Sequence, residues 1–339
     1  FRQSGLIPQK ASKTINTKMG DCKDVSTLFV TLCKEANIDA NLVLVDSRKY
    51  GSKSMALPSI NFDHCIAKVD LEDEEYFVEL TNDYNPFSTL YYGLKNAFAL
   101  EIIDDKAVKV KPEYLDPPTR CENSVYRESM VTFDDNVMHV DKSSLKIGGK
   151  ASSMRNSYRD IGKEEQDKKM KKAISGDYPN IKLDDLKFDE NLNNTHDSLK
   201  YEYSFTVEKV FNNIAGMYIL KLPWSDADEP VDFTGNSDRK YPLSLWRYNS
   251  VDTEEETMTI KIPENMDLAE VPESLELSCD AAEYSMTYKK EGNKLIITRR
   301  ISYTNDLVPL ENYTEFSEFF KKVIKSDTKQ IAFKKLETN

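Results

Sequence analysis

The chain has 339 residues, a length that allows two or three domains, and its 58 acidic and 46 basic residues give a net charge of −12. This acidic balance argues against nucleic acid and anionic membrane surfaces as the main partners. No apolar run reaches the ~18 residues of a transmembrane helix. The five cysteines form neither a disulfide framework nor a CxxC zinc pattern.

The chain begins with Phe1-Arg2-Gln3, without a methionine or a visible signal peptide. We therefore expect a processed or truncated piece of a longer protein, from which any targeting signal is missing. Residues 1–19 are expected to form an irregular lead-in with a turn at Pro8 and a short helix near Lys10–Lys18.

The stretch 20–36 predicts a well-capped helix. Gly20 marks a turn, Asp21 is a good N-cap, and Asp24 lies three residues later, as in a capping box. The i, i+3, i+4, i+7 spacing predicts burial of one helix face, formed by Val25, Leu28, Phe29, Leu32, Cys33 and Ala36.

Cys22 falls in the first turn of this helix. Backbone N–H groups without intrahelical partners and the positive end of the helix dipole stabilise a thiolate there, as a nucleophilic cysteine requires. The alternative is that Cys22 is simply a small residue at the start of a helix.

Strands follow the helix. Ala40–Val45 is β-rich and predicts a buried strand, and the long polar loop from Asp46 to Pro58 is either functional or a plain solvated connection. Two further strands, Ile60–Asp70 and Glu75–Leu80, flank a predicted hairpin turn in Leu71–Glu74.

An even-length hairpin loop places His64 and Glu79 on the same face of this strand pair. A loop at 71–72 makes them direct cross-strand partners, and a loop at 72–73 makes them diagonal neighbours. In either register the carboxylate can reach the imidazole, fix its tautomer and raise its basicity. The alternative is a buried histidine paired with a surface glutamate.

Three motifs resemble those of the bacterial transglutaminase-like core family, in the branch flanked by β-rich accessory domains. They are Gly20-Asp-Cys-Lys-Asp24, Phe62-Asp-His-Cys-Ile66 and Tyr76-Phe-Val-Glu-Leu-Thr81. The resemblance covers about residues 1–110 and implies a papain-like fold with a Cys-His-Asp triad. It assigns Cys22 as the nucleophile, His64 as the general base and acid, and Glu79 as the orienting carboxylate.

The third motif departs from the family, in which Asp is more common than Glu. Asp63, Asn82 and Asp83 therefore compete with Glu79 for this role. The family also places a polar or aromatic side chain beside the oxyanion hole, and Gln3 lies at about the matching position. The Cys22 backbone N–H would be the second donor.

The resemblance implies an enzyme that attacks amide bonds of a peptide or protein substrate and needs no cofactor. Water as the acyl acceptor gives hydrolysis, and an amine gives transamidation. The rivals are a papain-like cysteine peptidase that only hydrolyses and a non-catalytic envelope binding or scaffold protein that retains the fold. An extracytoplasmic or periplasmic location and a missing N-terminal β-rich domain are also implied by the resemblance.

No metal site is expected. An Asp226/Asp228 pair with His139 or His196 lacks a complete ligand spacing. The aromatic residues after Thr81 are expected to form core and cleft wall, since the chain is acidic: Tyr84, Phe87, Tyr91, Tyr92 and Phe98.

The expected domains are a transglutaminase-like core at 1–117 and a β-rich accessory region at 118–339, with a possible further break near 225–240. Ala99–Ile103 is expected to be the last strand of the core, and Asp116-Pro-Pro118 the linker. The predicted fold class is α+β, a papain-like transglutaminase core followed by a β-sandwich-like C-terminal region.

The accessory region is expected to consist of strands in which apolar and polar residues alternate, together with two helices. The expected helices are at about 160–175 and at 310–326, and Ile331–Phe333 is expected to be an edge strand. The expected strands are 125–133, 137–147, 198–207, 216–222, 258–262, 284–289 and 294–303.

Overall fold

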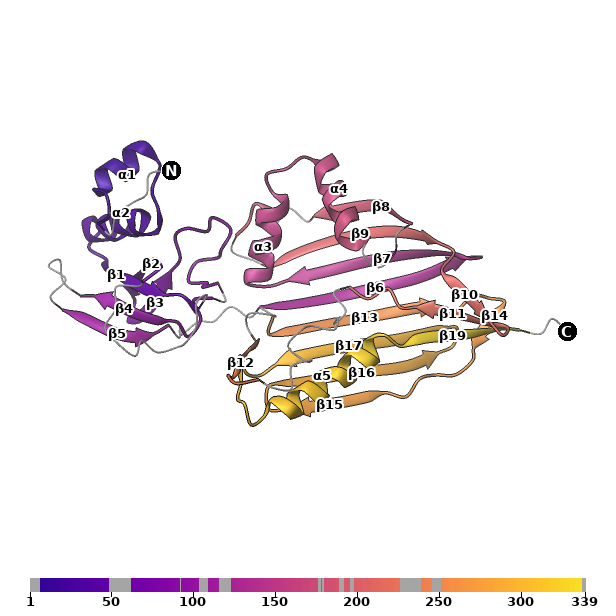
Figure 1. Cartoon of the computed structure of the whole chain (residues 1–339). Helices are drawn as coiled ribbons and strands as arrows, with labels where there is room; N and C mark the ends of the chain where they lie inside the picture. Colours follow the sequence, from indigo (N-terminus) through magenta and orange to yellow (C-terminus); the bar gives the residue numbers. More distant parts are fainter. Residues whose placement is uncertain are drawn as a thin grey trace. The chain divides into compact units, whose positions relative to one another are not determined.

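A computed structural model describes residues 7–48, 62–91, 93–103, 109–115, 123–175, 178, 180–188, 192–195, 198–225, 239–245 and 251–336. The chain divides into two compact units, which are described separately below (Figure 1). Unit 1 comprises residues 1–122 with 195–197, and unit 2 comprises residues 123–194 with 198–339.

Unit 1 is built on one antiparallel sheet with the order β3-β2-β1-β4-β5. Its elements are α1 (Ala11–Thr17), α2 (Cys22–Glu35), β1 (Asp39–Asp46), β2 (His64–Leu71), β3 (Glu74–Val78), β4 (Phe98–Ile102) and β5 (Val110–Tyr114). The prediction that 99–103 ends the core was wrong, because β5 pairs with β4 at the sheet edge. Its exposed Lys-Pro-Glu sequence carries no alternating apolar signal.

Helix α2 packs on one face of this sheet through only part of the face predicted from its apolar residues, together with residues beside it. Val30 and Cys33 are buried against the sheet, whereas the Leu32 side chain is 51% exposed. Ser26 is fully buried, and its hydroxyl donates to the Cys65 carbonyl over 3.1 Å. This bond satisfies a polar group at a position that the pattern assigned to solvent, so the buried stripe is rotated.

The opposite face of the sheet has its own small core, closed by the chain between β3 and β4. Val43, Ile66 and Phe77 from three neighbouring strands are buried together with Leu94 and Leu115. Both faces of β1 and β2 are therefore covered, which explains the nearly continuous apolar character of these strands.

Unit 2 contains most of the strands. Its elements are β6 (Ser124–Asp134), β7 (Val137–Lys146), α3 (Gly149–Tyr158), α4 (Lys163–Ile174), β8 (Ile181–Phe188), β9 (Leu199–Glu208), β10 (Phe211–Ile214), β11 (Met217–Lys221), β12 (Leu243–Ser244), β13 (Thr253–Lys261), β14 (Met266–Leu268), β15 (Leu275–Cys279), β16 (Ala282–Glu291), β17 (Lys294–Tyr303), β18 (Leu307–Val308), α5 (Tyr313–Asp327) and β19 (Gln330–Lys335). The predicted strands and the two predicted helices are present. Helix α3 was missed because its sequence is polar and only weakly amphipathic.

Eight strands form one long sheet with the order β15-β16-β17-β13-β6-β7-β9-β8. All neighbours in it are antiparallel except β6 and β13, which pair in parallel at its centre. Strands from before and after residues 225–240 therefore meet within a single sheet.

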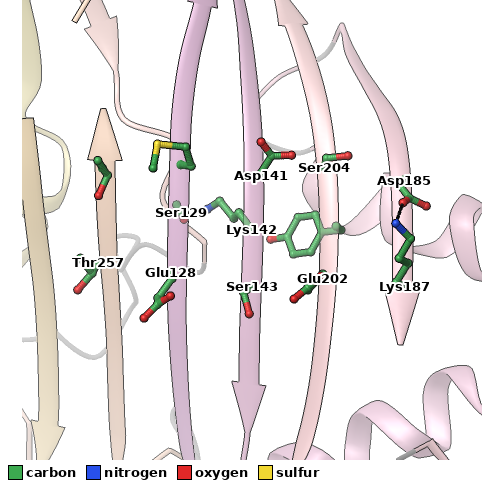
Figure 2. Close-up of a pocket in the computed structure, with 13 residues that line it drawn as sticks. Glu128, Ser129, Asp141, Lys142, Ser143, Asp185, Lys187, Glu202, Ser204 and Thr257 are labelled. Carbon is green, nitrogen blue, oxygen red and sulfur yellow. Dashed lines mark ion pairs between the residues drawn. The ribbon is translucent and has the colours of Figure 1, made fainter. Parts of the chain in front are cut away.

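Burial alternates along the strands of this sheet. On its open face stand Glu128, Asp141, Ser143 and Glu202, while the residues between them lie on the buried face (Figure 2). The buried face shares one apolar core with α3, α4 and α5 and with a four-stranded sheet of order β10-β11-β19-β14. Figure 1 shows α3 and α4 beside the β7–β9 end and α5 beside β15–β17. Strand β19 lies inside the small sheet, so its prediction as an edge strand was wrong.

Two clusters of buried charged side chains lie in unit 2. The Lys142 ammonium donates to the Pro223 carbonyl, the Ser225 hydroxyl and the Glu256 carboxylate over 2.5–2.8 Å. The Arg299 guanidinium donates twice to Asp327 over 2.8 Å. Because these groups are almost fully buried, their partners offset the cost of taking the charges out of water.

Candidate active site

Cys22 is the first residue of α2, directly after its N-cap. The Asp21 side chain accepts from the Asp24 N–H, and the Asp24 side chain accepts from the Asp21 N–H, so the predicted capping box is present. The second Asp24 oxygen accepts from the Gln9 N–H over 2.8 Å, which ties the lead-in segment to the helix start. These bonds fix the first turn and hence the position of Cys22.

Gly20 allows this first turn to form. A β-carbon at residue 20 would lie 2.7 Å from the β-carbon of Asp24, closer than two such atoms can approach. A glycine at this position therefore allows the backbone to approach the Asp24 side chain closely, in agreement with the turn predicted from the sequence.

His64 is the first residue of β2, and Glu79 directly follows β3. In the observed register Leu71 faces Glu74 and Ala67 faces Val78, so the turn residues are Glu72 and Asp73. This is the second of the two expected registers, in which His64 and Glu79 are diagonal neighbours on the same face. The His64 Nε2 atom lies 2.7 Å from the Glu79 Oε2 atom.

Both oxygens of Glu79 have partners. Its Oε1 atom accepts from the Thr81 N–H over 2.7 Å and from the Thr81 hydroxyl over 2.6 Å. Burial raises the pKa of Glu79, but the hydrogen bond and charge of His64 and the bonds from Thr81 outweigh it and hold the pKa below its usual value. Glu79 is therefore a fixed, ionised carboxylate behind the imidazole.

The other side of the His64 ring faces the thiol. Burial lowers the pKa of His64, but hydrogen bonds with the Cys22 and Glu79 side chains, and the charges of both, raise it to about 9. Since Nε2 is bound to Glu79, Nδ1 is the ring nitrogen that remains for Cys22. The bond to Glu79 fixes the tautomer of the His64 ring, and Nδ1 can then exchange a proton with the Cys22 sulfur.

Two of the three competitors for the third position have other partners, and the third, Asp83, is exposed. The Asp63 carboxylate accepts from the Ser47 N–H over 2.7 Å and from the Ser47 hydroxyl over 2.5 Å. The Asn82 amide bonds with Asn85 and with the Tyr84 N–H. Among the described carboxylates, only Glu79 forms a salt bridge or hydrogen bond with His64. Gln3 lies outside the described residues.

Tyr91 is a member of this site that the sequence did not single out. Its ring meets the His64 ring edge-on, with the two centroids 6.1 Å apart. Burial and the charges of Glu79, Asp63 and Cys22 raise the pKa of Tyr91 to about 12. In the sequence Tyr91 is one aromatic residue among several in a segment without periodicity. Only its distance from a strand histidine, visible after folding, distinguishes it.

Three other cysteines, Cys33, Cys65 and Cys279, are described by the structure. Burial raises the pKa of Cys33 and of Cys279, and burial with the charge of Cys22 raises that of Cys65 to about 12. In the part of the chain that the structure describes, no group of three or more His, Cys, Asp or Glu side chains is placed to hold a metal ion. His139 contacts Thr206, and His196, Asp226 and Asp228 lie outside the described residues.

Comparisons with known proteins identify the class of the first unit. Residues 3–78 match the family model of the Transglutaminase-like superfamily, and residues 216–333 match that of a domain of unknown function with a solved structure, DUF3858. Unit 1 is therefore a transglutaminase-like core, followed by an accessory domain. The predicted α+β class, a transglutaminase-like core with a strand-rich C-terminal region, is confirmed.

A solved structure shows a similar fold over nearly the whole chain. It comes from Parabacteroides distasonis ATCC 8503 and is described as "a putative protease". The TM-score is 0.50 and the identity 13%, over 96% of this chain and 46% of the other, so this chain spans about half of that protein's length. No curated protein matches the chain. None of the described helices is long and apolar enough to span a membrane.

Proposed function

We propose that the protein is a papain-like thiol enzyme that transfers or hydrolyses acyl groups at amide bonds of a peptide or protein substrate. The proposal rests on one observation: His64 is held between the Cys22 side chain and the buried Glu79 carboxylate, 2.7 Å from its Nε2 atom. A cysteine, a base and an orienting carboxylate in this order are the parts that thiol acyl chemistry requires.

The first half-reaction uses the proton that Cys22 and His64 share. His64 takes the thiol proton, and the Cys22 sulfur attacks the amide carbonyl carbon to give a tetrahedral oxyanion. His64 then donates that proton to the amide nitrogen as the C–N bond breaks. Ammonia or an amine leaves, and the acyl group remains on Cys22 as a thioester.

The second half-reaction reverses these roles. His64 takes a proton from water or from an amine such as a lysine side chain, and the oxygen or nitrogen attacks the thioester. His64 returns the proton to the Cys22 sulfur as the acyl product leaves. Water makes the enzyme a hydrolase or peptidase, and an amine makes it an acyltransferase; both uses need the same three side chains.

The oxyanion lies at the start of α2 in this proposal. The Cys22 backbone N–H belongs to the first turn, where N–H groups have no intrahelical acceptor. Gln3 would supply the second donor. Action outside the cytoplasm, on a peptide or protein in the cell envelope of a bacterium, is part of the same proposal, as is a further N-terminal β-rich domain.

The test is to incubate the chain with a glutamine-containing peptide and a labelled primary amine, and to measure amine incorporation and hydrolysis together. We expect at least one activity in the native chain and its loss in Cys22→Ala. Cys279→Ala is the matched control and should retain activity. Equal activity in the native chain and Cys22→Ala would overturn the role of Cys22. Absence of both activities with several peptide substrates would favour the non-catalytic scaffold.

A further inference from the structure

Unit 2 contains a cavity of about 160 Å³ between α3, α4 and the buried face of β6, β7 and β9. Aromatic rings dominate its wall, and most of them are almost fully buried. The aromatic residues are Tyr158, Tyr178, Tyr201, Tyr203, Phe205 and Trp224. An aromatic wall of this kind suits a flat or flexible apolar group.

The same wall carries three cations and no carboxylate among the described residues that line it. The cations are Arg127, Lys142 and Lys146. Lys142 forms a salt bridge with Glu256 over 2.8 Å, and Arg127 forms one with Glu254 over 3.8 Å. Lys146 has no carboxylate partner among the described residues, and its ammonium lies 5.7 Å from the centre of the Tyr201 ring. One uncompensated positive charge therefore borders the cavity.

Two further lysines lie over tyrosines of the wall. The Lys169 ammonium is 5.4 Å from the centre of the Tyr158 ring, and the Lys221 ammonium is 5.8 Å from that of Tyr178. In a chain with a net charge of −12, lysines gathered around an aromatic cavity produce a local positive potential. That potential favours an anionic group at this cavity.

A buried donor in the wall also lacks an acceptor. Trp224 is 6% exposed, and its indole N–H has no hydrogen-bond partner among the described residues. Leaving such a donor unsatisfied is unfavourable, and an acceptor inside the cavity would satisfy it.

The larger hollow of unit 2, of about 560 Å³, has the opposite character. It lies on the open face of the eight-stranded sheet, where Glu128, Asp141 and Glu202 stand among serine and threonine hydroxyls (Figure 2). A polar face opposite a packed one is the ordinary pattern of an antiparallel sheet in water. Its carboxylates disfavour an anion, so the aromatic cavity is the candidate site.

We propose that this cavity binds a small carboxylate with an apolar body about the size of a benzene ring. An engineered protein cavity of about 150 Å³ holds benzene, so 160 Å³ is enough for the body. The rings contact the body, Lys146 pairs with the carboxylate, and the Trp224 N–H is available as a donor. The shared chemistry of the ligand is one anionic group on an aromatic or short aliphatic body.

Trp224 makes binding measurable in the full chain. The sequence has two tryptophans, so Trp246→Phe leaves Trp224 as the single indole reporter. Sodium benzoate, the neutral benzyl alcohol and sodium hexanoate would each be titrated against its fluorescence. We expect saturable binding of benzoate and weaker binding of benzyl alcohol, and comparison with hexanoate distinguishes an aromatic from an aliphatic body.

Two variants decide the role of Lys146. In Lys146→Gln, benzoate binding should weaken about tenfold, the loss expected for one charge-assisted hydrogen bond, while benzyl alcohol binding stays unchanged. Lys200→Gln is the matched control, because Lys200 is an exposed lysine of β9 that pairs with Glu202, away from the cavity wall. It should leave both affinities unchanged.

A blocked entrance provides the second line of evidence. Ala173 lines the cavity from α4 and is exposed, so Ala173→Phe should obstruct the entrance and weaken benzoate binding, with folding checked by circular dichroism. If that variant does not fold, the comparison of Lys146→Gln with Lys200→Gln tests the proposal by itself. Equal affinity for benzoate and benzyl alcohol, or equal loss in both lysine variants, would overturn the carboxylate site at Lys146, and absence of saturable binding would show a hydrated gap only. Binding should persist in Cys22→Ala, so this result is independent of the proposed enzyme function.

Discussion

Each unit buries a pair of ionisable side chains, and the Lys142 pair of unit 2 is held differently from the His64 pair of unit 1. In unit 2, the Lys142 ammonium donates to three oxygens, and the carboxylate of its partner Glu256 also accepts from the Ser129 hydroxyl and the Ser225 N–H. In unit 1, His64 is bound firmly on one side only, by Glu79, and its other side is turned to Cys22.

The two buried groups differ in whether they can gain or lose a proton in the folded chain. A lysine with three acceptors keeps its proton, and its role is to fix how strands and loops pack. An imidazole between a fixed carboxylate and a thiol can gain and lose a proton without any rearrangement of its surroundings. We infer that the buried Lys142–Glu256 pair of unit 2 serves structure and the buried His64–Glu79 pair of unit 1 serves chemistry, and the following variants test this contrast.

The largest expected effect is the loss of the orienting carboxylate. Glu79→Gln should lower kcat/KM of the acyl-transfer or hydrolysis reaction by about 10³-fold, because the imidazole loses both its tautomer control and its stabilising charge. Asp63→Asn is the matched control, since Asp63 bonds Ser47 and not His64. A larger loss in Asp63→Asn would move the third role to that residue.

A loss of buried charge in unit 2 should affect stability instead. Glu256→Gln leaves the Lys142 ammonium without its counter-charge and should reduce the free energy of unfolding by about 3 kcal/mol, measured by urea denaturation. The rate of alkylation of Cys22 by iodoacetamide should not change. Altered alkylation without a change in stability would contradict the proposed division between the units.

The pH dependence follows from His64. Because the pKa of His64 is raised from 6.5 to about 9 in the folded chain, its charged form stabilises unit 1 fully below about pH 6.5, and this contribution is lost as the pH rises through about 9. Enzyme activity should fall over the same upper limb, since the imidazolium no longer has a proton for the leaving amine.

Nuclear magnetic resonance can follow this titration directly, because the chain has three histidines. His139→Gln and His196→Gln would assign the remaining signal to His64. Glu79→Gln should move its titration to lower pH, since a neutral amide no longer stabilises the imidazolium. A His64 signal that titrates near 6.5 in the native chain would contradict the paired arrangement.

The smallest expected effect concerns the helix that carries Cys22. Val30→Ala should destabilise unit 1 by about 2 kcal/mol, because Val30 is buried against the sheet, whereas Leu32→Ala should stay within about 0.5 kcal/mol. Thermal unfolding of the two variants would compare these faces of α2. The reverse ranking would restore the apolar face predicted from the sequence.

The parts of the site that depend on local rules could be read from the sequence. The cap at Asp21 and Asp24 placed Cys22 at a helix start, and the even loop length placed His64 and Glu79 on one face. The choice of Glu79 over Asp63 required the structure, because it depends on the bond that Ser47 makes with Asp63. No spacing in the sequence encodes that bond.

Features formed by separated segments could not be predicted. The contact of Tyr91 with His64 depends on the irregular chain between β3 and β4. The buried face of α2 was predicted only in part: Cys33 is buried as expected, but Ser26 is buried too, where its hydroxyl donates to a backbone carbonyl. The aromatic cavity joins residues of α3, α4 and several strands, whose register only the folded sheet defines.

The parallel seam between β6 and β13 has a consequence for synthesis. As the chain leaves the ribosome, β6 pairs first with β7, and its other edge stays open until Thr253–Lys261 has been made. An open edge can pair with another chain, and charges such as Arg127 and Glu128 within β6 discourage this. When β13 pairs with β6, Ser129 bonds Glu256 and Arg127 meets Glu254. A shift of β13 by one residue would turn Glu254 and Glu256 to the open face and leave Arg127 and Lys142 buried without their carboxylate partners. The buried polar side chains thus favour the observed register when β13 pairs with β6 and the eight-stranded sheet is completed.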